Sequence, residues 1–366
     1  MPVIDVHTGQ SYQVMIREGI LDELGPLASS LFDIRRALLV SDTRVYRLFG
    51  ERCLRSLRES GWQAAVSLVR PGERSKSLAT AGRLYSEALA AGLDRQCPVI
   101  ALGGGVVGDL AGFVAATYLR GIPFIQVPTT LLAQVDSSVG GKTGVNHPRG
   151  KNLIGAFHQP SLVLSDPASL GTLPRRQLRS GAAEVIKTAI ISDEAFFAWL
   201  EKNLPGLLHG DTAVQAEAVA RSVRFKAEVV QGDERESGSR RLLNFGHTIG
   251  HALEAATGYR HFLHGEAVLI GMAAATELSR LQGRLDRDSA RRIQALLCRV
   301  GLRPIPAGIT PEILLEKMRY DKKRRGAELF FVLPTAIGLA DHAAPADPGL
   351  LLQVLGLLLK GCGSFS

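Results

Sequence analysis

The sequence predicts an α/β protein with a Rossmann-like N-terminal domain, built on a mostly parallel sheet, and an all-α C-terminal domain. In the first half, short apolar runs such as "ALLVSD" and "PVIALGGG" alternate with amphipathic helical patterns, as in parallel sheets covered by helices on both faces. After "SLGTLPRRQL" the runs rich in β-branched residues nearly disappear, and helical periodicity continues with one late extended stretch, "ELFFVLP".

The length of the chain indicates two domains, because 366 residues are too many for one ordinary core. Pro174 and the basic residues that follow it mark the change in composition. We therefore expect one domain over residues 1–174 and a second over residues 175–366.

Each expected element follows from a local pattern. Short apolar runs bounded by polar or glycine-rich segments predict strands at 37–42, 64–69, 98–105 and 123–130. Apolar residues at helical spacing predict helices at 45–61, 77–92, 109–121 and 180–191. A helix from about Thr248 to Ala256 is expected because Ala, Leu, Glu and Ile dominate there, and Gly258 ends it.

Composition argues against several classes of protein. The net charge of +8 comes from Lys and Arg scattered over helical segments without interleaved aromatics, so we expect no nucleic-acid binding. The stretch "GLLLQVLGLLLKG" is too short to cross a bilayer, and "MPVIDVHTGQ" lacks the apolar region of a signal peptide, so we expect no membrane association. Cys53, Cys97, Cys298 and Cys362 form no CxxC pair, which predicts reduced thiols and a cytoplasmic protein.

Two glycine-rich segments of the first half favour phosphate binding. After the strand at 98–105, the glycines would let backbone N–H groups approach a pyrophosphate at a helix N-terminus, although a tight turn without a ligand is the alternative. In the preceding "PGERSKS", Glu73 and Lys76 could hold an adenosine ribose. In "QVPTTLLAQVDSSVGGKTGVNHPRGKNLIGAF", a loop with Lys142 and Asn152 could donate to a phosphate, and a plain surface loop is the alternative.

The segment "GHTIGHALEAATGYRHFLHGEAV" holds His247, His251, His261 and His264, four of the nine histidines. A catalytic zinc ion takes three nitrogen or oxygen ligands and keeps one position open. His247 and His264 could supply two nitrogens, while His261 is better explained as a solvated or hydrogen-bonded side chain. Spacing does not choose the third ligand among four carboxylates, which are Glu184, Glu228, Glu254 and Glu266.

Charged neighbours add two further candidates. Glu184 and Lys187 are three residues apart and share a helix face, either as an ordinary ion pair or as a metal ligand beside a cation for an anionic substrate. Lys322 and Lys323 precede the late extended stretch, where a solvated basic turn would also explain them.

Taken together, the sequence resembles the 3-dehydroquinate synthase family of the sugar phosphate cyclase superfamily. The resemblance extends from about Pro71 to Gly338 and is carried, in this order, by "GGGVVGDLAGFVAATYLRG", "QVDSSVGGKTGVNHPRGKNLIGAF", "SGAAEVIKTAII", "RRLLNFGHTIGHALEAATGYRHFLHGEAVLIGM" and "DKKRRGAELFFVLPTAIG". It implies a dehydroquinate synthase-like fold with NAD bound by the first domain, and with metal and substrate bound by the second.

The resemblance also implies the reaction. The enzyme would be a carbon–oxygen lyase that uses NAD and zinc, with cobalt as the alternative metal. It would convert an anionic sugar phosphate, 3-deoxy-D-arabino-heptulosonate 7-phosphate, to 3-dehydroquinate and phosphate in the shikimate pathway of aromatic amino acid biosynthesis. The steps are transient oxidation by NAD, elimination of phosphate, return of the hydride and aldol cyclisation.

Individual roles are implied by the same resemblance. The metal ligands of the family match Glu184, His247 and His264. Its catalytic positions match Lys142, Lys187, Asn244 and His251, and its substrate contacts match Arg120, Asp136, Asn152, Lys226, Arg240 and one of Lys322 and Lys323. NAD contacts match Asp42, Glu73, Lys76, Gly104, Gly105, Asp109, Thr129, Thr130, Lys142, Lys151 and Thr172. Arg120 matches an arginine that reaches the neighbouring subunit, which implies a homodimer, and Arg44 stands where a small polar residue is expected.

Three other functions compete with this one. Other sugar phosphate cyclases act on substrates without a carboxylate and tend to lose cations such as Lys226 and Arg240, which are present here. A metal-dependent alcohol dehydrogenase of the glycerol dehydrogenase type would have no use for "GGKTG". A catalytically silent NAD-binding module would not need the full set of ligands and lysines.

Overall fold

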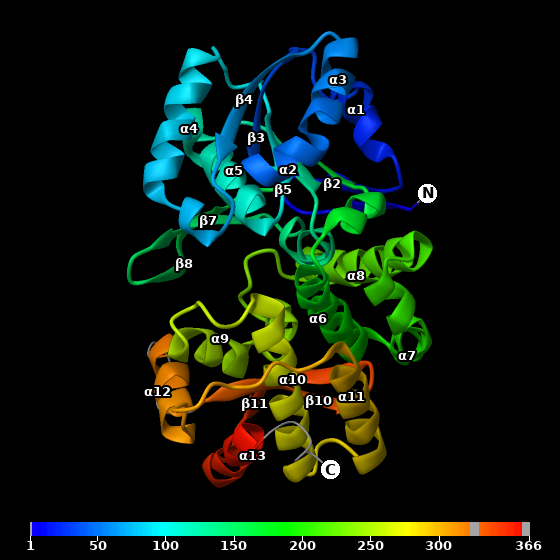
Figure 1. The fold of residues 1–366 in the computed structure, drawn as a ribbon, viewed down its shortest axis with the longest axis vertical. Coiled ribbons are helices and arrows are strands. Elements are labelled where there is room, and N and C mark those ends of the chain that lie inside the picture. Colours follow the sequence, from blue (N-terminus) through cyan, green and yellow to red (C-terminus); the bar gives the residue numbers. More distant parts are fainter. Residues whose placement is uncertain (1, 323–328, 361–366) are drawn as a thin grey trace. The chain divides into compact units, whose positions relative to one another are not determined.

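The computed structural model describes the backbone of residues 2–322 and 329–360, and the side chains of all of these except 320–322. Two compact units make up the chain (Figure 1): the first is Met1–Leu173 with Gly210–Arg235, and the second is Pro174–His209 with Glu236–Ser366. No helix in the described part of the chain is both long and apolar enough to span a membrane.

The first unit is built on a mostly parallel sheet, which confirms the predicted architecture. Within the described residues, seven strands lie in the order β1 (Val3–Val6), β2 (Tyr12–Ile16), β9 (Leu162–Ser165), β6 (Phe124–Pro128), β5 (Val99–Gly103), β3 (Arg36–Asp42) and β4 (Gln63–Val69). All neighbours pair in parallel except β1 and β2. The central strands β5, β6 and β9 are buried over their whole length, which explains why they are continuous apolar runs.

Helices cover both faces of this sheet (Figure 1), with α1 (Leu24–Ser29) and α3 (Glu51–Glu59) on one face and α4 (Leu78–Ala90) and α5 (Gly105–Thr117) on the other. Alternate residues of β3 serve the two cores, since Leu38 and Val40 pack with α4 and α5 whereas Ala37 and Leu39 pack with α1 and α3. The sheet is therefore the middle of three layers.

The predicted domain boundary requires a correction at α8 (Thr212–Gly232). A single boundary after residue 174 assigns this helix to the second domain, yet residues 210–235 belong to the first unit. The helix packs against β1, β2 and the helical turn η5 (Ala133–Ser137). The His7 N–H donates to Gln231 Oε1 at 2.7 Å, and the Gly9 N–H donates to Glu234 Oε2 at 3.1 Å. The helical periodicity of the second half extends through this segment but contains no information about its packing partner.

The glycine-rich segment after β6 forms a hairpin and not the expected loop. Strands β7 (Lys142–His147) and β8 (Gly150–Phe157) pair antiparallel. Gly155 lets them approach, because a Cβ there would lie 2.3 Å from the Thr143 carbonyl oxygen. The hairpin packs on α5, where Gly112 makes room for the Thr143 side chain. Small residues in this segment thus serve close packing.

The second unit is mostly helical, with one small sheet in addition to the predicted all-α structure. Its helices are α6 (Arg175–Ser192), α7 (Glu194–His209), α9 (His247–Ala256), α10 (His264–Leu281), α11 (Arg287–Val300), α12 (Pro311–Lys322) and α13 (Pro348–Lys360). Strands β10 (Phe330–Ala336) and β11 (Leu339–Pro345) pair antiparallel. The late apolar stretch is β10, whereas β11 escaped prediction because its seven residues include no β-branched residue and no Phe, Tyr or Trp, and only one of them is buried.

Three helices of this unit approach each other backbone to backbone. A Cβ on Gly271 of α10 would lie 1.9 Å from the carbonyl oxygen of Gly246, the residue before α9. A Cβ on Gly265, at the start of α10, would lie 1.9 Å from the Ser180 carbonyl oxygen of α6. Glycine is therefore required at both positions, and α10 lies against α6 and α9 without intervening side chains.

We expect Gly271→Ala to destabilise the second unit, because the new methyl group has to separate α10 from the segment before α9. Overpacking of this kind typically costs about 1–3 kcal/mol. Gly356→Ala in α13 is the matched control, since a Cβ there meets no atom within 4 Å. The control is expected to gain up to about 1 kcal/mol from helix propensity. Urea unfolding measures both effects, and equal free energies of unfolding for the two variants would contradict this account of the packing.

Candidate active site

Three helices bring Glu184, His247 and His264 together. Glu184 lies in the middle of α6, and each histidine is the first residue of its helix, α9 or α10. One potential ligand atom from each side chain lies within 4.8 Å of the other two. Residues up to 80 positions apart in the sequence thus form one cluster, which we call the Glu184–His247–His264 cluster.

The two imidazoles point their Nε2 atoms at the same carboxylate oxygen. Nε2 of His264 is 3.5 Å from Glu184 Oε1, and Nε2 of His247 is 3.9 Å from it. The other ring nitrogens are held from behind: His247 Nδ1 lies 3.1 Å from the Phe245 carbonyl oxygen, and His264 Nδ1 lies 3.3 Å from Glu254 Oε2. Metal-binding histidines are commonly oriented in this way, with one nitrogen fixed and the other directed at the ion.

The buried carboxylate of Glu184 fits a cation. Glu184 is 1% exposed. Lys187 Nζ lies 2.5 Å from Oε2, whereas Oε1 lies 3.5 and 3.9 Å from the ring nitrogens of His264 and His247, beyond the ordinary length of a hydrogen bond. A buried charged oxygen without hydrogen bonds is costly, and a divalent cation bound by one carboxylate and two imidazoles would satisfy it.

The three side chains of the cluster carry different charges at neutral pH. Burial and the Lys187 ammonium lower the pKa of His247 to about 3, so this ring is neutral. Burial also acts to lower the pKa of His264, but the Glu184 and Glu254 carboxylates on either side of the ring raise it to about 10. Burial opposes ionisation of Glu184, whereas Lys187 and the histidines hold the pKa of its carboxyl group well below its usual range. His264 is thus a cation that must lose a proton before it can bind a metal.

Contacts in the structure distinguish the four carboxylates that the sequence offered as a third metal ligand. Glu266 pairs with Arg176 at 2.7 Å and accepts the Leu263 N–H at the start of α10. Glu254 lies behind His264, and Glu228 is exposed on α8 in the other unit. Among the four, only Glu184 faces the Nε2 atoms of both His247 and His264.

Other predicted residues of the second unit lie on the same helices or just before them. Lys187 is one turn after Glu184 on α6, and the ring of His251 lies 5.3 Å from that of His247, centroid to centroid. Arg240 and Asn244 lie on the helical turn η7 (Ser239–Asn244), which leads into α9. Lys322 ends α12 with its side chain outside the described atoms, and Lys323 lies outside the described residues.

Glu236 is a residue that sequence reasoning missed. Its backbone has a φ of 57°, and its Oε1 accepts a hydrogen bond from Asn244 Nδ2 at 2.9 Å. A carboxylate in a polar loop has no distinguishing spacing, so nothing in the sequence pattern marked it. The contact orients the amide of a predicted catalytic residue.

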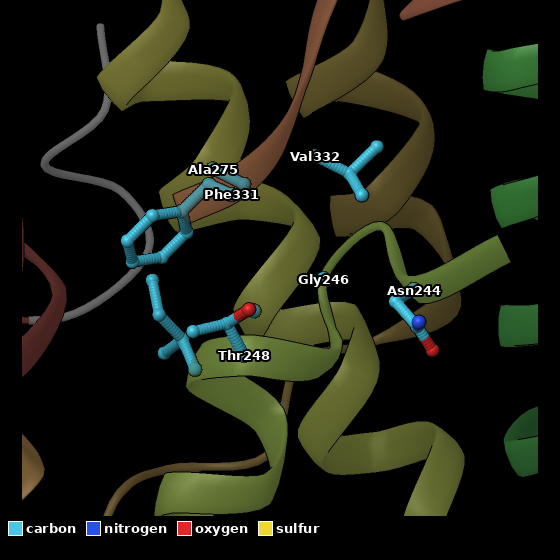
Figure 2. Close-up of a pocket in the computed structure, with 8 residues that line it drawn as sticks. Asn244, Gly246, Thr248, Ala275, Phe331 and Val332 are labelled. Atoms are coloured by element: carbon cyan, nitrogen blue, oxygen red, sulfur yellow. The ribbon is translucent and has the colours of Figure 1, made fainter. Parts of the chain in front are cut away.

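A small pocket lies beside the same segment (Figure 2). It is a shallow hollow with no room for an enclosed water molecule, lined by Asn244, Gly246, Thr248, Ile249, Gly271, Ala275, Phe331 and Val332. Figure 2 shows the Asn244 amide turned away from Phe331 and Thr248. None of these lining residues is charged, so the pocket does not suit an anionic substrate.

The predicted cofactor residues of the first unit follow the carboxyl ends of its parallel strands. Asp42 ends β3, and the others follow their strands: Glu73 and Lys76 after β4, Gly104, Gly105 and Asp109 after β5, Thr129 and Thr130 after β6, and Thr172 after β9. The strand order reverses between β3 and β5, because β4 lies on one side of β3 and β5 lies on the other. Ligands of open α/β sheets bind at such a reversal, outside the carboxyl ends.

Two observations at this edge fit a polar ligand. Thr129 Oγ1 is buried without a hydrogen-bond partner among the described residues. Helix α5 begins at Gly105, so its first N–H groups face this edge. The glycines also serve packing, since a Cβ on Gly104 would lie 3.0 Å from Thr130 Cγ2. The tight-turn alternative therefore explains part of the glycine pattern.

Lys76 joins this edge to the hairpin. Its Nζ lies 2.5 Å from Asp109 Oδ2 and also donates to Asn152 Oδ1. Burial raises the pKa of Asp109, and the Lys76 ammonium opposes this effect. Asn146, which sequence reasoning missed, donates to Glu73 Oε1 at 2.7 Å and accepts the Asn152 N–H at 2.9 Å. The hairpin is thereby fixed to the loop after β4.

The remaining candidates of the first unit are placed differently. Lys226 of α8 donates from Nζ to both the backbone oxygen and the Oδ1 of Asp136, each at 2.6 Å. Lys142 is exposed at the start of β7, and Lys151 lies near the hairpin turn. Arg120 is exposed with a φ of 69°.

Asp42 caps the short helix α2 (Thr43–Val45). Its Oδ1 accepts hydrogen bonds from the N–H groups of Arg44 and Val45, at 2.8 and 3.0 Å.

Comparison with known proteins agrees with the resemblance seen in the sequence. The family models "3-dehydroquinate synthase N-terminal" and "3-dehydroquinate synthase C-terminal" match residues 66–180 and 181–324. The 3-dehydroquinate synthase of Pelotomaculum thermopropionicum is 52% identical over 99% of this chain and 100% of its own. That of Desulforamulus reducens is 50% identical over 97% and 99%.

Solved structures of related cyclases share the fold. A 2-deoxy-scyllo-inosose synthase in complex with carbaglucose-6-phosphate, NAD+ and Co2+ superposes with a TM-score of 0.88 at 25% identity, over 98% of this chain and 100% of its own. A 2-epi-5-epi-valiolone synthase from Streptomyces hygroscopicus, with NAD+ and Zn2+ bound, has a TM-score of 0.88 at 29% identity over 98% and 99%. The sequence matches over nearly the whole length decide among these relatives: the chain belongs to the 3-dehydroquinate synthase family.

Proposed function

We propose that this protein converts 3-deoxy-D-arabino-heptulosonate 7-phosphate to 3-dehydroquinate and inorganic phosphate, a step toward the aromatic amino acids in the shikimate pathway. The observation that carries the proposal is the Glu184–His247–His264 cluster in a chain that is half identical to 3-dehydroquinate synthases. The enzyme would be a carbon–oxygen lyase that eliminates phosphate and requires NAD and a divalent metal.

The metal is assigned to Glu184, His247 and His264, whose donor set of one carboxylate and two imidazoles suits zinc. When bound, it would polarise the substrate oxygen at the carbon that is oxidised. Zinc is the metal we propose and cobalt is the alternative, since one solved relative carries Zn2+ and another carries Co2+.

NAD is assigned to the carboxyl edge of the parallel sheet, where Thr129 Oγ1 and the first N–H groups of α5 offer hydrogen-bonding groups. When bound, it would accept a hydride from the substrate and return it within one turnover. Both relatives with a TM-score of 0.88 contain NAD+, which supports this assignment. Lys76 and Glu73 lie at the same edge and would contact its ribose.

Cationic side chains would hold the two anionic ends of the substrate. Lys142 and Asn152 on the hairpin would bind its phosphate, and Lys226 and Arg240 would bind its carboxylate, with Asn244 beside them. Lys187 would face the oxidised carbon from its place beside Glu184. His251 would assist proton transfer, and the substrate's own phosphate would act as base.

The nearest rival is a cyclase for a sugar phosphate without a carboxylate. The fold does not separate the two functions, since solved cyclases of that type have TM-scores of 0.88. Sequence identity favours 3-dehydroquinate synthase activity over the rival. The chain is 52% identical to a 3-dehydroquinate synthase but only 25–29% identical to the two solved cyclases of the rival type. A glycerol dehydrogenase from Schizosaccharomyces pombe, at 17% identity and a TM-score of 0.69, shares the fold alone.

A homodimer is part of the proposal. Arg120 follows Leu119, and both have positive φ values, 69° and 49°. Leu119 is exposed, as is Leu153 on β8, so apolar side chains face solvent where a second copy of the chain would cover them. Arg120 would complete the partner's active site. Cytoplasmic location and the lack of nucleic-acid or membrane partners also stay predictions.

Purified protein with NAD and Zn2+ is expected to release phosphate from 3-deoxy-D-arabino-heptulosonate 7-phosphate and to form 3-dehydroquinate. His264→Ala should lower turnover by at least about a thousandfold without unfolding the chain, because one of three metal ligands is lost. His261→Ala is the control and should retain activity. Phosphate assays and ultraviolet absorbance of the product measure both. Cyclisation of glucose 6-phosphate, with no turnover of the heptulosonate, would assign the protein to the rival class.

Subunit mixing is expected to reveal the role of Arg120. Arg120→Ala and His264→Ala homodimers should each be nearly inactive. In a mixed dimer, one site receives Arg120 from the His264→Ala subunit and keeps its own His264, so random mixing should restore about a quarter of wild-type activity. Recovery that stays at background would mean that Arg120 acts within its own subunit.

Metal binding is expected to release about one proton at pH 7.5, because the pKa of His264 is raised to about 10 in the metal-free protein. The affinity for Zn2+ should therefore rise as the pH rises through the range below that pKa. Calorimetric titration in two buffers with different ionisation enthalpies measures the number of protons. A value near zero would show that His264 is already neutral before the metal binds.

A further inference from the structure

Glu254 is a buried carboxylate that contacts His264 from behind. The residue is 3% exposed, and its Oε2 lies 3.3 Å from His264 Nδ1. On the other side of the same ring, Nε2 lies 3.5 Å from Glu184 Oε1. The imidazole of His264 thus lies between two carboxylates, one on each ring nitrogen.

Helix α9 fixes the position of Glu254. Its residues His247, His251 and Glu254 are spaced as i, i+4 and i+7, so they share one helix face. Gly250 packs against the backbone of Ala267 in α10, where a Cβ would lie 3.1 Å from the carbonyl oxygen. The carboxylate therefore reaches the first residue of α10 from a rigid helix that also supplies a second metal-ligand candidate.

The two histidines are oriented by different means. His247 Nδ1 faces the backbone oxygen of Phe245, which no substitution removes, whereas His264 Nδ1 faces a side chain. An ionised carboxylate only accepts hydrogen bonds, so this contact requires the proton of a neutral His264 to be on Nδ1. The lone pair then lies on Nε2, which faces Glu184 Oε1.

We propose that Glu254 is a positioning residue that holds His264 in the Nδ1–H tautomer and so presents Nε2 to a divalent cation bound with Glu184 and His247. The inference rests on the metal site of the proposed function. The alternative is that Glu254 is itself a ligand, since His251, Glu254 and His264 form a second group of suitable atoms. We favour Glu184, His247 and His264 as the ligands, because Nε2 of His264 and Nε2 of His247 both face Glu184 Oε1, whereas His251 is exposed.

The proposal is tested with Glu254→Leu and Glu254→Gln in the full-length chain. Leucine removes the acceptor, while glutamine keeps an amide oxygen that accepts the Nδ1–H. Metal-free protein is titrated with Co2+, and the affinity and the visible absorption bands are recorded together. Glu254→Leu should bind Co2+ about 10–100-fold more weakly, and Glu254→Gln should stay within about threefold of wild type with the same bands.

A structural readout separates tautomer control from general damage. In the proton spectrum of the Co2+ form, the ring N–H groups of bound histidines appear as strongly shifted, exchangeable signals. The signal of His264 should be present in wild type and Glu254→Gln, and should be lost or exchange faster with water in Glu254→Leu. Glu277→Leu is the matched control, since Glu277 is a buried carboxylate of α10 that pairs with Arg280. It should leave affinity and signals unchanged.

Wild type and His264→Ala complete the experiment. Failure of wild type to bind Co2+ would refute the metal site and the proposed function with it. If wild type binds and His264→Ala does not, wild-type affinity in Glu254→Leu would overturn the positioning role alone. Loss of binding and altered bands in Glu254→Gln would overturn it as well, and would make Glu254 a ligand.

Discussion

Backbone contact between α10 and its two neighbours, α6 and α9, is the constraint on which the candidate metal site depends. Gly265 lies against Ser180 of α6, and Gly271 lies against Gly246 just before α9, with room for no Cβ at either glycine. Both histidines are first residues of their helices, so a displacement of either helix axis displaces a potential ligand by a similar distance. Metal–ligand distances tolerate only about 0.2 Å. The glycines therefore determine the geometry of the site as much as the residues that would bind the ion.

Buried or partly buried ion pairs recur beside the candidate residues of both units. Glu184 pairs with Lys187 in one unit, and Lys76 with Asp109 and Lys226 with Asp136 in the other. Removing two charges from water costs more than many such pairs return, so these pairs are poor evidence for stability. Each pair places a lysine beside a carboxylate at a candidate site, and an anionic ligand would have to compete with that carboxylate for the ammonium group.

The sequence predicted those parts of the structure that depend on local patterns. Strands β5 and β6 are buried on both faces, so their residues are continuously apolar and were placed within a few positions. Contacts between distant segments were not predictable in this way. Four carboxylates matched the histidines by residue type, and only the packing of α6 against α10 selects Glu184. Asn146 and Glu236 act through single hydrogen bonds that follow no spacing, and the hairpin β7–β8 was obscured by its glycines.

Helix α8 has a consequence for how the polypeptide can be divided. The chain leaves the first unit after Leu173, returns at Gly210 and leaves again after Arg235, so the units are joined by three covalent connections. A gene fragment that ends at the composition change near Pro174 would encode the whole sheet but not the helix that covers β1 and β2. Its complement would carry an amphipathic helix with nothing to pack on. Neither half of this protein is a portable module, because residues 1–173 share a unit with 210–235, and residues 174–209 share the other unit with 236–366.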